Sequence, residues 1–250
     1  MKQFLLTDKI IIITGASSGI GQATARLCAK AGAKIILLGR NEERLKATYE
    51  SLEGEGHLWY SIDLSDFSLL QKFVNEDLKG LNIIHGIVHA AGVTSTYPFR
   101  LIKMEHMDSY FKINVYAAFQ LSRLLLKKAK VQGASFVFVT SVMASVGEKA
   151  KSLYSMTKGA VLSGARSLAL ELSGQNIRVN CVSPGVVNTP MTENANYKRD
   201  PKLYQAMLEK HPLGFGDAED VANAVLFLLS DASSWMTGTD IKVDGGYTAQ

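Results

Sequence analysis

Residues 9–39 read KIIIITGASSGIGQATARLCAKAGAKIILLG, and this stretch decides the fold. Two short runs rich in isoleucine and leucine, at 9–14 and 34–39, flank a glycine-rich turn and an amphipathic segment at 19–31. Short apolar runs that alternate with longer helical patterns are typical of βαβ units, in which a helix joins two parallel strands. The stretch therefore predicts the first unit of a parallel sheet.

The same alternation continues along the chain. We expect further strands at 57–62, 83–89, 135–140, 177–183 and 240–243, and helices at 42–52, 67–78, 107–130, 151–172 and 218–229, the last with Asp217 as its N-cap. Most strands are apolar on both faces, as in a sheet that helices cover on each side. No repeat or linker divides the chain. Residues 1–250 are therefore predicted to form a single α/β domain, a doubly wound Rossmann-type fold with a seven-stranded parallel sheet.

Composition limits the class of function. The chain has 250 residues, of which 47% are hydrophobic and 20% charged, with a net charge of +4 and one short basic cluster at 127–130. This is typical of a compact globular protein and gives no support to nucleic-acid binding. Cys28 and Cys181 lie in apolar segments, which indicates buried thiols in a reducing compartment. Because neither a signal peptide nor a run of about 18 apolar residues is visible, we expect a cytoplasmic protein without a membrane partner.

One segment departs from the alternation. Residues at about 190–212, between the sixth strand and the last helix, form a polar insertion. Long insertions in compact domains are usually functional or mobile. This one follows the carboxyl end of a strand, where α/β sheets bind their ligands, so we expect it to form a substrate loop.

The glycine-rich turn at 14–21, TGASSGIG, is a candidate cofactor site. Glycines let the backbone approach a pyrophosphate, and the N-terminus of the following helix offers free N–H groups. A tight turn without a ligand has the same pattern, so the turn alone does not decide the question.

The end of the second strand indicates which dinucleotide binds. Folds that bind NAD usually have an acid there, which holds the ribose 2′-hydroxyl; this chain has Arg40, followed by Asn41. Arginine can bind a 2′-phosphate with two charge-assisted hydrogen bonds, and Asn41 could add a contact. The sequence thus favours NADP(H) over NAD(H), unless Arg40 is only a solvated charge. Asp63, after the third strand, is a candidate either to bind the adenine or to cap the next helix.

Tyr154 and Lys158 are a candidate acid/base pair. They are four residues apart in a predicted helix, so they lie on one face. A free phenol has a pKa of about 10, and a nearby ammonium favours the phenolate. Ser141 follows the fifth strand, where its hydroxyl could polarise a carbonyl beside the phenol. A Tyr-x-x-x-Lys pair also occurs by chance in many helices.

Together these motifs resemble those of the short-chain dehydrogenase/reductase family over nearly the whole chain. The match consists of TGASSGIG at 14–21, Asn114, Ser141, Tyr154-x-x-x-Lys158 and PGVVNT at 184–189. The resemblance implies a tetrad in which Tyr154 is the general acid/base and Ser141 holds the carbonyl. It implies that Lys158 lowers the pKa of the tyrosine and that Asn114 holds a water of a proton relay. The implied reaction transfers a hydride between a nicotinamide and a carbonyl or secondary alcohol.

The resemblance also implies the cofactor site. Besides Arg40, Asn41, Tyr154 and Lys158, that site would include Gly15, Ser17, Ser18, Gly19, Ile20, Gly21, Asp63, Leu64, Ala91, Gly92, Pro184, Gly185, Val187 and Thr189. One motif departs from the family: where many members have Asn-Asn-Ala-Gly, this chain has His89-Ala90-Ala91-Gly92. The change puts in doubt how the neighbouring strands are held.

The substrate is less well defined by the sequence. Met143 and Met191 indicate an apolar, adaptable pocket with Tyr197, Tyr204 and Met207, although these residues could equally pack the insertion itself. The leading hypothesis is an NADP(H)-dependent reductase of a small or medium ketone, or the reverse alcohol dehydrogenase. The alternative is a 3-oxoacyl-(acyl-carrier-protein) reductase that acts on an acyl thioester, with Lys127, Lys128 and Arg178 as candidates for docking an acidic carrier. A non-catalytic NADP(H)-binding sensor is the second alternative, against which the complete tetrad argues.

Two further expectations concern assembly and metals. The family commonly forms dimers and tetramers, so we expect a homo-oligomer. Ala160 and Gly164, on one helical face, could allow close helix contact, although small residues also pack within monomers. No metal site is expected, because His85 and His89 in one strand would lie about 13 Å apart and could not share an ion.

Overall fold

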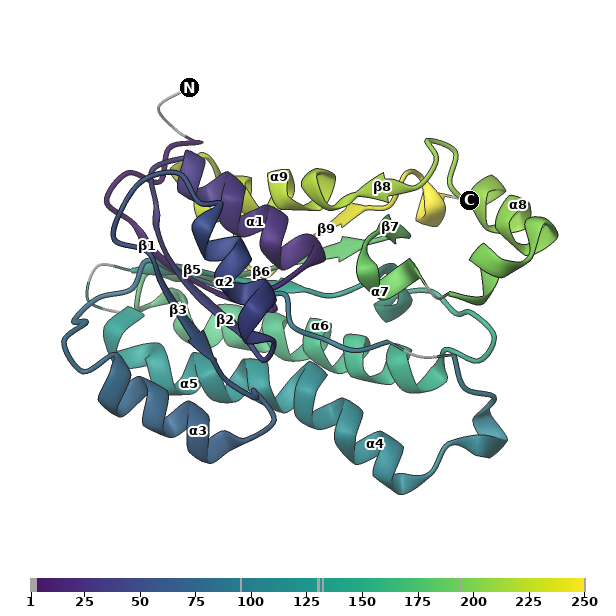
Figure 1. Cartoon of the computed structure of the whole chain (residues 1–250), viewed down its shortest axis with the longest axis horizontal. Coiled ribbons are helices and arrows are strands. Elements are labelled where there is room, and N and C mark those ends of the chain that lie inside the picture. Colours follow the sequence, from purple (N-terminus) through teal and green to yellow (C-terminus); the bar gives the residue numbers. More distant parts are fainter. Residues whose placement is uncertain (1–3, 95, 130, 132, 194, 250) are drawn as a thin grey trace.

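The computed structural model describes residues 4–94, 96–129, 131, 133–193 and 195–249. Its centre is a parallel sheet in the order β3-β2-β1-β4-β5-β6-β9 (Figure 1). The seven strands are β1 (Ile10–Thr14), β2 (Lys34–Gly39), β3 (Leu58–Ser61), β4 (Gly86–His89), β5 (Ala134–Val139), β6 (Ile177–Pro184) and β9 (Asp240–Val243). The chain begins in the middle, runs outward to β3, crosses back to β4 and runs outward to β9. This confirms the predicted doubly wound Rossmann-type fold.

Helices cover both faces of the sheet, as Figure 1 shows. One face carries α1 (Gly19–Lys30), α2 (Glu42–Glu50) and α9 (Ala218–Leu229), and the other carries α3 (Phe67–Lys72), α4 (Met104–Phe111), α5 (Ala117–Ala129) and α6 (Ser152–Ser173). Asp217 is the N-cap residue of α9, as predicted, and its backbone N–H donates to the Asp220 carboxylate.

The strands are apolar on both faces because each face packs against helices. Ile12 and Ile36 lie in the core with residues of α5 and α6, whereas Ile11 and Ile35 lie in the core with residues of α1 and α9. Successive strand residues point to opposite faces, so a strand covered on both sides needs a continuous apolar run. The isoleucine run of β1 meets this requirement.

Some element boundaries differ from the predicted ones. The strand predicted at 83–89 begins only at Gly86, because the N–H of Ile84 donates to the carbonyl of Lys128 at the end of α5. The helix predicted at 107–130 begins at Met104 and contains a π-helical turn, Lys112–Tyr116, between α4 and α5. A second π turn, Phe73–Asp77, ends the helix that begins with α3. Hydrophobic periodicity does not reveal these wider turns.

The polar insertion contains regular structure that the sequence analysis did not predict. It forms α7 (Pro190–Glu193), a 3₁₀ turn (Asn196–Arg199) and α8 (Pro201–Glu209). The Asp200 carboxylate caps α8 by accepting from the N–H of Lys202 at 2.8 Å, and Pro201 occupies the first turn. An Asp-Pro pair at this position is an ordinary helix-start signal. Beside the insertion, β7 (Val187–Asn188) pairs with β8 (Gly216–Asp217).

Thr14 and His89 show how the strands are held where the family motif is altered. The Thr14 hydroxyl donates to the Val88 carbonyl at 3.4 Å and accepts from the Ala91 N–H at 3.2 Å, so it ties β1 to the end of β4. His89 is buried and its Nε2 lies 2.8 Å from the Ser122 hydroxyl. Burial lowers the pKa of His89 to about 3, so the ring is a neutral part of the core.

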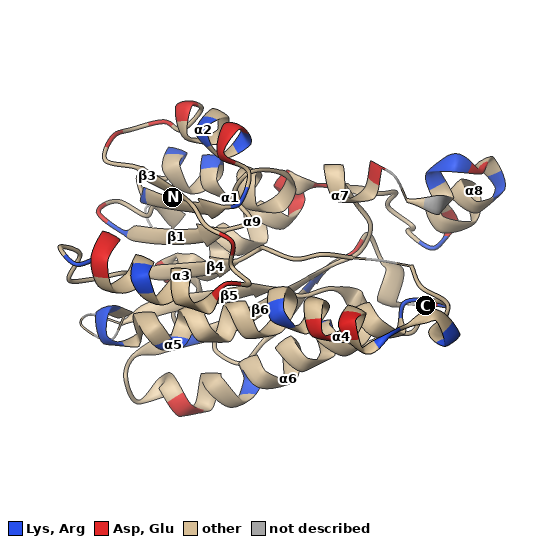
Figure 2. Ribbon diagram, turned by 60° about the horizontal axis from the view of Figure 1, so that its bottom comes forward, with Lys and Arg blue, Asp and Glu red and all other residues tan. Residues whose placement is uncertain are grey.

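Neither a membrane span nor a metal cluster is present in the part of the chain that the structure describes. None of the described helices is both long and apolar enough to cross a bilayer. No described group of His, Cys, Asp and Glu could hold a metal ion; Nδ1 of His85 instead accepts from the N–H of Ile10. Figure 2 shows Lys and Arg scattered over helices on both faces of the sheet.

Tight packing at the start of β4 gives a stability prediction. A methyl group on Gly86 would lie 2.8 Å from the side chains of Ile11 and Leu229, so we expect Gly86→Ala to be overpacked. Its free energy of unfolding, measured by urea denaturation, should fall by about 1–3 kcal/mol. Gly80→Ala is the control, because a methyl group there has no neighbour within 4 Å. Equal stability of the two variants would contradict the prediction.

Candidate active site

The predicted site residues follow the carboxyl ends of the strands. Because all seven strands are parallel, these ends lie along one edge of the sheet. Two adjoining cavities lie there, with volumes of about 670 and 240 Å³. They share lining residues that include Ile20, Gly92 and Thr189. The fold therefore brings the dispersed motifs of the sequence into one continuous space.

The smaller cavity is lined by the glycine turn and by the segments after β2, β3 and β4. It brings together the following predicted cofactor residues: Gly15, Ser17, Ser18, Gly19, Ile20, Gly21, Arg40, Asn41, Asp63, Leu64, Ala91, Gly92 and Thr189. Arg44 and Ile62 also line it. The sequence analysis missed both, although Arg44 lies one helical turn after Arg40.

The glycine turn is a cradle that side chains would fill. Gly15 has φ of +67°, and a Cβ there would lie 2.8 Å from the backbone N of Ala91. A Cβ on Gly21 would lie 2.4 Å from the carbonyl oxygen of Gly15. Ser18, the N-cap residue of α1, makes no side-chain capping bond, and the first turn of α1 has no acidic residue. These residues fit the pyrophosphate of a dinucleotide, which helix N-termini bind through backbone N–H groups.

Arg40 and Arg44 are the cations of the smaller cavity. Arg40 is exposed and follows β2 directly. Asn41 is the N-cap residue of α2, and its Oδ1 accepts from the N–H of Arg44 at 2.8 Å. The capping bond uses only Oδ1 and leaves the Nδ2 donor of Asn41 out of the cap, while Arg44 adds a second cation to the cavity that Arg40 lines.

Asp63 does not cap α3. Its Oδ1 accepts from the N–H and hydroxyl of Ser65 at 2.9 and 2.7 Å, and these bonds, with a smaller contribution from Arg40, lower the pKa of Asp63. Asp66 caps α3 instead, by accepting from the N–H of Ser68 at 2.9 Å. The capping alternative for Asp63 is therefore wrong, and its place in the cavity leaves it available to a ligand.

Lys158 is buried beneath the larger cavity. Its Nζ donates to the carbonyl of Val139, at the end of β5, at 2.7 Å. The same Nζ lies 5.7 Å from the centroid of the Tyr154 ring, as expected for residues one turn apart in α6. Burial lowers the pKa of Lys158 to about 8, so the side chain remains mainly an ammonium at neutral pH.

Tyr154 is held as a neutral phenol. Burial raises its pKa to about 12, and a hydrogen bond with the Ser141 side chain opposes this shift. The direction is opposite to the one expected from Lys158, because burial, which disfavours the phenolate, is the largest cause of the shift. Ser141 also caps the 3₁₀ turn Val142–Ala144, where its hydroxyl accepts from the N–H of Met143 at 3.2 Å. The site thus presents a protonated Tyr154 beside a fixed hydroxyl.

Asn114 lies behind the cavities and lines neither of them. It sits on the π turn Lys112–Tyr116, where its Oδ1 accepts from the N–H of Val93 at 2.8 Å. Its Nδ2 donates to the carbonyl of Val93 and to the Thr157 hydroxyl, both at 3.0 Å. Asn114 therefore fastens the segment after β4 to α6, next to Lys158.

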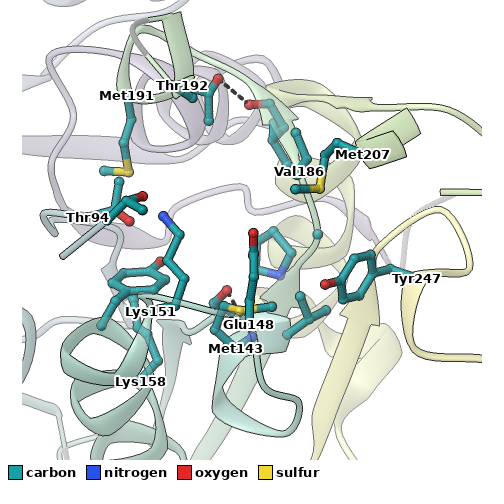
Figure 3. Close-up of a pocket in the computed structure, with 18 of the residues that line it drawn as sticks. Thr94, Met143, Glu148, Lys151, Lys158, Val186, Met191, Thr192, Met207 and Tyr247 are labelled. Atoms are coloured by element: carbon teal, nitrogen blue, oxygen red, sulfur yellow. Dashed lines mark hydrogen bonds between the residues drawn. The ribbon is translucent and has the colours of Figure 1, made fainter. Parts of the chain in front are cut away.

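The larger cavity contains the remaining predicted residues. Tyr154, Lys158, Pro184, Gly185, Val187 and Thr189 line it, together with Met143 and Met191 from the predicted substrate set. Tyr197 and Met207 also line it, whereas Tyr204 packs edge-on against Phe215. Figure 3 shows four lining residues that the sequence analysis did not select, Thr94, Glu148, Lys151 and Tyr247.

His211 joins the insertion to the segment that follows β6. Its Nε2 accepts from the N–H of Val186 at 3.1 Å, and its Nδ1 lies 2.8 Å from the carbonyl of Met207. An acceptor at one nitrogen and a donor at the other define a neutral ring. The buried imidazole thereby fixes the end of α8 beside the segment that follows β6.

Comparisons with known proteins agree with this geometry. A profile of the family described as enoyl-(acyl carrier protein) reductase matches residues 15–248. A 3-oxoacyl-(acyl-carrier-protein) reductase of Thermotoga maritima is 35% identical, over 96% of this chain and 98% of that protein. An L-xylulose reductase of Bos taurus is 34% identical, over 98% of each. The crystal structure of a short-chain type dehydrogenase/reductase from Mycobacterium marinum matches with a TM-score of 0.90 and 29% identity, covering 100% of this chain and 99% of that one.

The chain belongs to the short-chain dehydrogenase/reductase family. It is therefore an oxidoreductase, and reductases of this family use nicotinamide cofactors. The glycine cradle and the smaller cavity provide the residues that would hold the dinucleotide in this short-chain dehydrogenase/reductase.

The glycine cradle gives a binding prediction. In Gly21→Ala the new methyl group would force the turn away from the Gly15 carbonyl, so we expect the affinity for the nicotinamide dinucleotide to fall about tenfold or more, which is about 1.4 kcal/mol. Isothermal titration calorimetry measures this affinity. Gly174→Ala, where a methyl group has no neighbour within 4 Å, is the control. A folded Gly21→Ala protein with unchanged affinity would show that the turn does not hold the cofactor.

Proposed function

We propose that this short-chain dehydrogenase/reductase is an NADP(H)-dependent reductase of small or medium ketones, with Tyr154 as the proton donor. The observation that carries the proposal is the neutral Tyr154 phenol, hydrogen-bonded to Ser141 and next to the Lys158 ammonium, at the wall of one cavity. A protonated phenol is the form required to reduce a carbonyl, and the reverse oxidation would need the phenolate.

The chemistry follows from where charge develops. A bound NADPH supplies the hydride to the carbonyl carbon. The Ser141 and Tyr154 hydroxyls lie close enough to each other to bind the same carbonyl oxygen, which becomes negative as the carbon is reduced. Tyr154 then gives its Oη proton to that oxygen. The phenolate that remains is stabilised by the Lys158 ammonium, which the carbonyl of Val139 holds in place.

Two further residues support this arrangement without lining the cavity. The Thr157 hydroxyl accepts from Nδ2 of Asn114 and donates to the backbone carbonyl of Tyr154 at 2.8 Å. Asn114 is thereby connected to the turn of α6 that carries Tyr154. The water-holding role expected for Asn114 stays a prediction. Both hydrogens of its side-chain amide already have partners in the chain, so its side-chain nitrogen has no hydrogen left to donate to a water.

An acyl thioester is the second candidate substrate, because several relatives are named 3-oxoacyl-(acyl-carrier-protein) reductases. Two of the three residues expected to dock a carrier protein, Lys128 and Arg178, do not support it. Nζ of Lys128 donates to the carbonyls of Leu78 and Leu81, and the Arg178 guanidinium donates to carbonyls that include that of Leu228. Lys128 ends α5 and Arg178 begins β6, so both lie at the amino-end edge of the sheet, away from the cavity. The ketone is therefore the leading substrate.

A homo-oligomer and a cytoplasmic location stay predictions. Gly164 no longer serves as an argument for contact between subunits, because it packs within the chain. A methyl group on Gly164 would lie 2.6 Å from Cζ of Phe119 in α5. The small residue therefore allows α5 and α6 of the same chain to approach each other.

Tyr154→Phe tests the proposed reaction. Without the donor hydroxyl we expect kcat for NADPH-dependent reduction to fall by about 10²–10⁴-fold, the usual contribution of general acid catalysis, while NADPH affinity is unchanged. NADPH consumption is measured with diketones, acetoacetyl thioesters, ketosteroids and ketoses. Tyr49→Phe, on an exposed part of α2, is the control. Full turnover by Tyr154→Phe would overturn the role of Tyr154, and tight NADPH binding with no turnover of any substrate by the wild type would favour the non-catalytic sensor.

The cofactor preference has its own test. We infer that Arg40 and Arg44 together bind the 2′-phosphate of NADPH, so replacing either with Leu should lower the ratio of kcat/KM for NADPH to that for NADH by about tenfold or more. Lys46→Met is the control, because Lys46 lies on the same helix with its ammonium 3.9 Å from Glu50. A ratio that stays unchanged in both arginine variants would remove the support for NADP(H).

A further inference from the structure

The larger cavity is lined by two kinds of side chain. Met143, Met191 and Met207 provide an apolar, adaptable lining (Figure 3). Glu148, Lys151, Tyr197 and Tyr247, here called the polar quartet, line the same cavity. The mechanism described above uses none of these four residues. They come from the loop before α6, from the insertion and from the C-terminal turn, so only the fold brings them together.

Glu148 is the centre of the polar quartet. Burial lowers the pKa of Lys151 and raises the pKa values of Tyr197 and Tyr247; the charge of Glu148 opposes the first shift and adds to the other two. The side chain is half-buried. Within the described ranges, no group forms an ion pair or hydrogen bond with its carboxylate. A half-buried carboxylate loses part of its hydration. A substrate that donates hydrogen bonds to it would replace the hydrogen bonds from water that burial has removed.

The backbone holds Glu148 and Lys151 in place. The N–H of Lys151 donates to the carbonyl of Glu148 at 3.2 Å, which closes a tight turn. Ala150 in this turn has φ of +61°, a left-handed conformation that is unfavourable for a residue with a Cβ. The N–H of Tyr97 donates to the Ala150 carbonyl at 2.9 Å and holds the turn from outside. Glu148 and Lys151 are thus held at the two ends of this turn, and Lys151 lies three residues before Tyr154.

The Tyr197 hydroxyl supplies a second, independent indication of a ligand. Its oxygen is closed off from solvent and has no partner of good hydrogen-bonding geometry among the described residues, although Thr192 lies near it. A buried hydroxyl without a hydrogen bond is costly and uncommon in folded proteins. A polar substituent of a bound substrate would provide the missing partner.

The mixture of groups indicates what that substituent is. An anion would be repelled by Glu148, and a cation would be repelled by Lys151. A hydroxyl group can donate to the carboxylate, accept from the ammonium and do either with a tyrosine. We propose that the polar quartet recognises hydroxyl groups, so that the carbonyl compound reduced by this enzyme is a polyhydroxylated ketone of the ketose class. This inference rests on the proposed function and names its substrate.

A matched pair of four-carbon substrates tests the inference. Erythrulose carries hydroxyl groups beside its ketone, whereas 2,3-butanedione has none. In Glu148→Leu we expect kcat/KM for erythrulose to fall by about tenfold to a hundredfold, the range for a lost hydrogen bond to a charged group, with kcat/KM for butanedione unchanged. Glu209→Leu is the matched control, because Glu209 is exposed at the end of α8 and lies outside the cavity lining. Glu148→Gln, which keeps one acceptor oxygen, should fall between wild type and Glu148→Leu.

The outcomes separate this inference from the proposed function. An equal loss for both substrates in Glu148→Leu, or a wild-type preference for the anionic ketone acetoacetate, would overturn the ketose assignment while leaving ketone reduction intact. If the wild type reduces neither substrate, the proposed function fails. Binding of erythritol by saturation-transfer NMR then decides: binding that Glu148→Leu abolishes supports hydroxyl recognition, and binding that is absent or unaffected overturns it.

Discussion

The parallel pairing of β1 with β4 is the constraint on which the rest of the molecule depends. Thr14 faces His89 in this register, and the Thr14 hydroxyl continues the connection to Ala91. The order of the strands reverses between β1 and β4, so the connections leave in opposite directions and open a crevice at the carboxyl ends. The close contact of Gly15 with Ala91 lies at this point. Both cavities and the side chains proposed to be catalytic are arranged along the edge that this pairing defines.

Desolvation sets the protonation states along that edge. The same burial raises the pKa of Tyr154 and lowers the pKa of Lys158, because in each case it disfavours the charged form. The consequences for the two groups differ: the phenol stays protonated at neutral pH, while the lysine keeps most of its charge. The fold thus stores a proton on Tyr154 and a compensating cation beside it.

Much of this could be predicted from the sequence. Apolar runs of strand length that alternate with helical patterns fixed the order of elements, since a sheet covered on both sides requires such runs. The glycines of the turn, Ser141, Tyr154 and Lys158 were identifiable because their chemistry depends on residue type and short spacing. Several residues of the smaller cavity, such as Leu64 and Ala91, were expected only through the family resemblance, and Arg44 and Ile62 were not expected at all.

The parts that escaped prediction depend on geometry between distant segments. Glu148, Lys151 and Tyr247 are ordinary polar residues in the sequence, and only the closed fold places them with Tyr197 around one cavity. Asp63 and Asp66 both precede α3, and the turn formed with Ser65 decides which of them caps it. The effect of burial on Tyr154 was likewise invisible, because spacing gives the distance to Lys158 but not the loss of water.

The π turn at Lys112–Tyr116 makes the length of a helix part of the active site. A π turn holds one residue more than the α-helical turn it replaces, and such turns often occur at functional positions. Removing one residue between α4 and α5 would restore regular α-helical winding, and the residues of the turn itself would then point in other directions around the helix axis. Asn114 would then lose its position against Val93 and Thr157 although its own codon is intact. In this segment a one-residue deletion would displace Asn114 much as a substitution would remove it, so the number of residues between α4 and α5 matters as well as their identity.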